Sequence, residues 1–147
     1  MTQTLITRLS KLDAPDREVD WLIADHFDEI PKHTIREIGW DYDWWRGPNE
    51  YSLKKAIDSE GRRIDTWYPN TYTASIDAAI ALAERVLPGW KWRVGRTEVF
   101  PNGWAYVHKY DPSNCDRIDE AACADGKAAN PAIALLIALL RAKEASL

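Results

Sequence analysis

Apolar residues near the N-terminus recur three and four positions apart, which is the period of a helix with one buried face. The segments 5–12 and 19–26 both show this pattern. Pro15 interrupts the pattern between them, and Asp13 can serve as the N-cap of the second helix. We therefore expect two helices in this part of the chain, the second ending before Pro31.

Two further helices are expected in the second half of the chain. The segment 76–83 is amphipathic, with Thr73 or Ser75 as its N-cap. The segment 131–140 follows Asn130 and is apolar on nearly all sides. A helix without a polar face must be surrounded by other groups. This last helix is therefore either the central packing element against a sheet or, in part, a contact between subunits.

Strict alternation of apolar and polar residues predicts two strands between these helices. They cover 90–94 and 104–110, and the turn residues 101–103 separate them. We expect 111–129, which is polar and acidic, to be a connection to the last helix.

The stretch 32–70 is the least regular part of the sequence. Aromatic and acidic residues alternate over 40–44, which predicts a strand, and 64–68 is expected to return as its partner. Gly47-Pro48 predicts a turn, and 51–57 a short helix.

The 147 residues are expected to form a single domain, 1–147, with an aromatic-rich insertion at about 27–70. A chain of this length buries roughly 70% of its unfolded surface, whereas about 40 residues are too few for an independent core. Helices from both ends of the chain then flank the predicted strands. The expected fold class is α+β, an α/β/α sandwich with a small antiparallel sheet flanked by helices.

Charge and aromatic content narrow the choice of partners. The net charge of −4 argues against non-specific binding to nucleic acid, so a nucleic-acid partner is not expected. The charge is uneven, with ten acids against three bases over 13–43 and five bases against one acid over 85–109. Eight Trp and six Tyr against two Phe favour rings that carry a polar atom, and such rings suit interfaces as well as cores.

The sequence predicts no metal site, cofactor or membrane span. Cys115 and Cys123 match no zinc spacing, and we expect them to be reduced thiols. No stretch reaches the roughly 18 apolar residues of a membrane span. The segment 1–11 lacks the apolar core of a signal peptide, so we expect a cytoplasmic protein.

No enzymatic activity is expected either. The three histidines, His26, His33 and His108, are scattered along the chain, and a lone histidine is more often structural than catalytic. The sequence has no glycine-rich phosphate loop after a strand and no motif for a Ser or Cys nucleophile. We therefore predict no catalytic residues.

The first candidate site is an acidic, aromatic run that suits a basic protein partner, because Trp and Tyr are good interface anchors. The alternative is that these rings pack the insertion onto the domain. The run consists of Trp40, Asp41, Tyr42, Asp43, Trp44 and Trp45.

The second candidate site joins the polar sides of the two strands in the second half of the chain. If those sides coincide, bases and aromatic rings lie together on one sheet face, where they can stack a nucleobase and hold a phosphate. The alternative is that a helix or the insertion covers this face. The residues are Lys91, Arg93, Trp104, Tyr106 and His108.

Three stretches of sequence carry a family resemblance. PDREVD from Pro15, YTASIDAA from Tyr72 and NPAIAL from Asn130 occur in this order along the chain. They resemble small phage and prophage proteins, the phage ABA sandwich domain family. The resemblance implies an α/β/α sandwich and a phage-derived setting in the cytosol of a host cell, and it carries no assigned activity.

On this basis we expect a phage-type accessory protein that binds a host protein, for example as a counter-defence, anti-CRISPR-like inhibitor. The alternative function is binding and sequestration of a nucleotide or another small molecule. Self-association through the last helix, 131–140, is left open.

Overall fold

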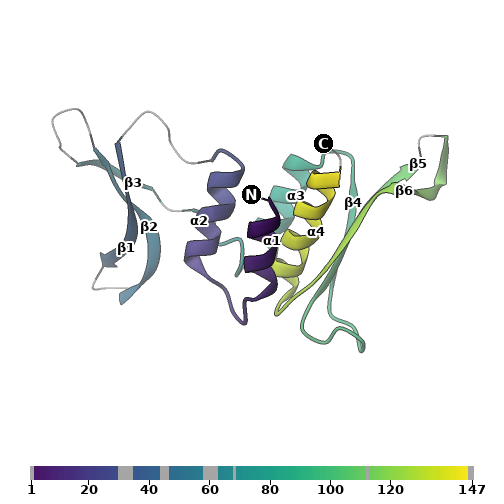
Figure 1. Ribbon diagram of the computed structural model, residues 1–147, viewed down its shortest axis with the longest axis horizontal. Helices are drawn as coiled ribbons and strands as arrows, with labels where there is room; N and C mark the ends of the chain where they lie inside the picture. Colours follow the sequence, from purple (N-terminus) through teal and green to yellow (C-terminus); the bar gives the residue numbers. More distant parts are fainter. Residues whose placement is uncertain are drawn as a thin grey trace. The chain divides into compact units, whose positions relative to one another are not determined.

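The computed structural model describes residues 2–29, 35–43, 47–57, 63–67, 69–111 and 113–145. The chain divides into two compact units, one formed by Met1–Pro15 with Tyr72–Leu147 and the other by Asp16–Thr71 (Figure 1). Each unit combines helix with one three-stranded antiparallel sheet. The predicted α+β class, with a small antiparallel sheet flanked by helices, is confirmed.

The sheet of the first unit has β5 as its central strand. It consists of β4 (Lys91–Gly95), β5 (Trp104–Asp111) and β6 (Asn114–Lys127). The β4–β5 pairing is regular from end to end. The β5–β6 pairing is regular near the β4–β5 loop and shifts register beyond His108.

Three helices of this unit stack on the sheet through α4 (Pro131–Ala145), which contacts all three strands. The helices α1 (Thr2–Ser10) and α3 (Ile76–Val86) pack against α4, as Figure 1 shows. Every residue of α4 from 132 to 140 is buried. The burial that an apolar helix requires is therefore met within the chain.

The start of α4 is fixed by a side chain that bonds in two directions. The Asn130 Oδ1 accepts a hydrogen bond from the Ile133 amide at 2.8 Å, as an N-cap does. Its Nδ2 donates to the Thr73 carbonyl at 2.9 Å. The same residue thus caps α4 and ties it to the segment that leads into α3.

Gly126 of β6 lies directly against the backbone of α4. A Cβ atom at this position would lie 2.2 Å from the Ala134 carbonyl oxygen and 3.0 Å from the Ala138 nitrogen. Ala105 and Val107, whose neighbours across the sheet include Gly126 and Ala124, are 0% and 1% exposed. The face that carries these small residues is therefore the face that α4 covers.

The second unit contains α2 (Arg17–His26) and the sheet β1 (Ile35–Asp43), β2 (Gly47–Ile57) and β3 (Arg63–Trp67), in the order β1-β2-β3. The helix α2 contacts β2. The predicted insertion at about 27–70 falls within this unit, and the single-domain prediction stays a prediction.

A buried ion pair anchors the first turn of α2. The Arg17 Nη1 lies 2.7 Å from the Asp20 Oδ2, and Asp20 is fully buried. The Arg17 guanidinium also donates to the carbonyl oxygens of Pro69 and Asn70, at 2.8 and 3.2 Å. Because this one guanidinium bonds to all three groups, it holds the C-terminal end of the 16–71 segment against α2.

Five local predictions are wrong. The strand expected over 64–68 was predicted to pair with 40–44, but β3 pairs with β2. The N-cap of α2 is Asp16, which accepts from the Val19 amide, rather than Asp13. Gly47-Pro48 begins β2 instead of forming a turn, and 51–57 continues that strand instead of forming a helix. Here pairing with β1 outweighs a weak local preference.

The fifth error concerns 111–129, most of which is the long strand β6 rather than a connection. Its inward positions near the C-terminal end are Ala124 and Gly126, and a methyl group and a hydrogen atom give almost no hydrophobic alternation.

Candidate functional site

Strand register places both predicted basic residues beside the predicted aromatic row. Lys91 of β4 pairs with His108 of β5, and Arg93 pairs with Tyr106. Directly paired residues point to the same face of a sheet, and side chains alternate between the faces along each strand. The face defined in this way, called the aromatic face below, carries Lys91, Arg93, Trp104, Tyr106, His108, Tyr110, Cys123, Asp125 and Lys127.

Within its own unit the aromatic face is open. The helix α4 lies on the opposite face, and α1 and α3 pack against α4 (Figure 1). The charged side chains of Lys91, Arg93, Asp125 and Lys127 are exposed. Tyr110 is 38% exposed, and the rings of Trp104 and Tyr106 are half-buried. Ring surface and charge are therefore both presented to solvent.

The aromatic side chains form one continuous row along β5. The ring centroids of Trp104 and Tyr106 are 6.4 Å apart with planes 3° from parallel. Tyr106 and His108 follow at 5.3 Å, and His108 and Tyr110 at 5.2 Å with an edge-to-face angle of 80°. Of these four rings, those of Trp104, Tyr106 and Tyr110 present surface to solvent, whereas the His108 ring between them is buried.

Positive charge flanks the row on both sides. Lys91 and Arg93 lie on β4, and Lys127 lies on β6 opposite Trp104. Asp125, opposite Tyr106, is the one carboxylate among the described side chains of this face. Three cations against one acid favour an anionic ligand.

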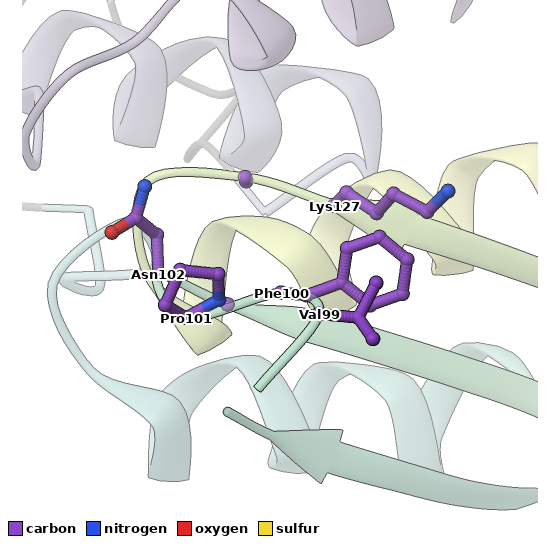
Figure 2. Close-up of a pocket in the computed structure, with 7 residues that line it drawn as sticks. Val99, Phe100, Pro101, Asn102 and Lys127 are labelled. Atoms are coloured by element: carbon purple, nitrogen blue, oxygen red, sulfur yellow. The ribbon is translucent and has the colours of Figure 1, made fainter. Parts of the chain in front are cut away.

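A small hollow extends the Trp104 end of the aromatic face. The loop 99–103, Lys127 and Ala128 line an open hollow of about 160 Å³ (Figure 2). The Lys127 Nζ lies 4.4 Å from the centroid of the Phe100 ring, within cation–π range. Figure 2 shows the Lys127 side chain running past this ring. A further ring and a cation are thus available beyond the row itself.

The surroundings of His108 and Tyr106 favour their uncharged forms. Burial lowers the pKa of His108 below its ordinary 6.5, and the nearby charges of Arg93 and Lys91 lower it further. His108 is 2% exposed, and among the described residues its Nδ1 atom has no hydrogen-bond partner. Burial raises the pKa of Tyr106, as do the Cys123 thiol to which it is hydrogen-bonded and the Asp125 carboxylate, while Arg93 lowers it. Neutral rings suit stacking rather than proton transfer.

The five residues predicted for the second site lie together on this face, and their binding role stays a prediction. The sequence did not assign Cys123, Asp125 and Lys127 to the site, because they lie in the segment taken for a connection. The alternation of small and polar residues over 123–127 is the sequence pattern that could have indicated a strand here.

The acidic, aromatic run is only partly covered by the structure. Its first four residues, 40–43, lie in β1, and Trp44 and Trp45 lie outside the described residues. The side chains of this run are likewise outside the description, so the protein-binding hypothesis stays a prediction.

Other site types find no support in the part of the chain that the structure describes. Among those residues, no group of three His, Cys, Asp or Glu side chains could hold a metal ion. None of the described helices combines the length and apolar character needed to cross a bilayer.

Comparison with known proteins does not assign the chain to a family. No family model matches it, and neither the curated proteins nor the solved structures contain a significant match. The resemblance to the phage ABA sandwich family therefore stays a prediction.

Proposed function

We propose that this protein acts by non-covalent binding and holds a nucleotide, or a similar ligand with a planar ring and a negative charge, on the aromatic face. The single observation that carries the proposal is the register that sets Arg93 beside Tyr106 on the sheet face opposite α4. A guanidinium next to a half-buried ring can pair with a phosphate while the ring stacks on a base.

The energies involved favour such a ligand over an uncharged one. Stacking of a base on an aromatic side chain contributes about 1–3 kcal/mol. Charge-assisted hydrogen bonds from Arg93 to a phosphate are roughly twice as strong as neutral ones. Neither contribution needs a deep pocket, which agrees with a site built on an open sheet.

Calorimetric titration with a panel of mononucleotides and cyclic dinucleotides tests this function. We expect saturable binding that Tyr106→Ala and Arg93→Gln each weaken. The matched control is Arg85→Gln, which removes the same charge from α3, a helix that packs on α4 rather than on the sheet. Absence of binding by every ligand in the panel would refute the proposal. So would equal losses in the Arg93 and Arg85 variants.

A second candidate function is binding of a host protein through β1, in keeping with a phage-derived counter-defence role in the host cytosol. The observation that favours it is the position of β1 at the edge of the sheet β1-β2-β3. An edge strand offers unpaired backbone groups to a strand of a partner, and the acids Asp41 and Asp43 lie on this strand. We expect Asp41→Lys with Asp43→Lys to abolish capture of a basic partner from a bacterial lysate. Unchanged capture would contradict this function. Self-association through α4 stays a prediction.

A further inference from the structure

We infer that the aromatic face binds several linked nucleotides at once, as a single-stranded nucleic acid laid along β5. This inference rests on the proposed function, because it names the class of ligand that the same face would take.

The length of the ring row is the first argument. From Trp104 to Tyr110 the row covers six residue steps of a strand, or roughly 20 Å at 3.3–3.4 Å per residue. A mononucleotide would use one ring and leave the others in solvent. A strand of linked bases can use successive rings, and stacking tolerates any base because every base has a flat face.

The distribution of charge is the second argument. The cations lie along the row rather than at one point, with Lys91 and Arg93 on the β4 side and Lys127 beside Trp104. A chain of phosphates can pair with all three, whereas the phosphate of one nucleotide cannot span them. The Phe100 ring under Lys127 adds a stacking surface beyond the end of the row.

The net charge of −4 does not oppose binding at this face. The most acidic segment is 13–43, and nearly all of it belongs to the other unit. Net charge governs non-specific association, whereas a stacking platform depends on its local charge. The net charge of −4, from which we expected no nucleic-acid partner, does not describe the local charge of this face.

The openness of the face selects single strands over duplexes. Bases in a duplex stack on one another and hide their flat faces, so rings on a sheet can reach only unpaired bases. The rings and cations alone do not distinguish ribose from deoxyribose, so RNA and DNA are separate arms of the test.

The test is a fluorescence-anisotropy titration of the full chain with labelled oligouridylate and oligothymidylate, from one nucleotide to about 12 nucleotides long. We expect affinity to rise at least tenfold from the mononucleotide to a length of about four nucleotides, and to fall as salt is raised. Tighter binding in one arm assigns the sugar. A complementary duplex is expected to bind more weakly than either strand.

Variants at the ends of the row separate multiple contacts from a single one. Tyr110→Ala is expected to weaken oligonucleotide binding roughly 5- to 100-fold, and so to reduce the gain in affinity from the mononucleotide to the oligomer. Tyr110→Phe keeps the ring and should retain the affinity. Tyr110 is exposed, so the substitution spares the core, and a melting curve confirms that each variant folds.

The outcomes distinguish this inference from the proposed function. If mononucleotides bind and longer oligomers bind no more tightly, the inference is overturned and the proposed function stands. A duplex that binds as well as its single strands also overturns it. If neither mononucleotides nor oligomers bind, both fail.

Discussion

Replacing Gly126 by alanine would place a methyl group against the backbone of α4. The added Cβ would lie 2.2 Å from the Ala134 carbonyl oxygen, 3.0 Å from the Ala138 nitrogen and 3.0 Å from the Ile137 Cβ. Ordinary contacts begin near 3.4 Å, so helix and strand must separate by about 1 Å. Two of the three atoms are backbone, so no side-chain rotation can relieve the contact.

The expected cost is at the upper end of the range for overpacking, about 3 kcal/mol. For a chain of this size, such a loss lowers the melting temperature by roughly 10 °C. The assay is urea unfolding followed by far-UV circular dichroism, with melting curves as a second measurement.

Gly95→Ala is the matched control. Gly95 pairs with Trp104 at the other edge of the same sheet, on the aromatic face, and a Cβ there has nothing within 4 Å. We expect a change within about 0.5 kcal/mol. If both variants unfold at the same urea concentration as the parent chain, α4 does not lie on the Gly126 face. The aromatic face could then not be identified as the face that α4 leaves open.

Three further predictions concern stability. Arg17→Met should cost about 3–5 kcal/mol because it leaves the buried Asp20 carboxylate without its ion pair, and urea unfolding of Arg17→Met with Asp20→Leu should show most of that loss recovered. Asn130→Ala should cost about 1–2 kcal/mol through loss of the α4 cap and the bond to Thr73, and a melting temperature equal to that of the parent would contradict this. His108 has a pKa lowered by burial, so the unfolded chain binds its proton more readily. Its contribution to stability is therefore present above pH 6.5 and is lost as the pH falls below 6.5 toward the folded-state pKa. In urea unfolding at pH 5 and pH 7, the free energy of unfolding should fall less between the two pH values for His108→Phe than for the parent. An equal fall in both chains would contradict the lowered pKa of His108. His26, whose pKa is also lowered by burial, is present in both chains and so does not affect the comparison.

Helix positions were largely predictable from the sequence. The stripes of α1, α2 and α3 follow the helical period, and the N-caps Ser75 and Asn130 are residues that favour that position. The all-apolar α4 could belong only to the interior. These features depend on neighbours within a few residues, so the sequence carries the information locally.

Strand partners were harder to predict. The β6 strand faces α4 with Ala124 and Gly126, and at Gly126 the helix backbone leaves no room for a side chain. Small inward residues give no hydrophobic alternation, so the strand resembled a polar connection. The pairing of Arg93 with Tyr106 depends on the register across the β4–β5 loop, which neither strand determines alone.

The measurement that tests the binding site most directly is a two-dimensional ¹H–¹⁵N NMR titration of the full chain with a mononucleotide. We predict progressive shifts of the Trp104 indole N–H signal and of the amide signals of β4 and of β5 from Trp104 to Tyr110. The amide signals of α1 and α3 should not shift. An unchanged spectrum, or shifts confined to residues away from the aromatic face, would contradict this prediction.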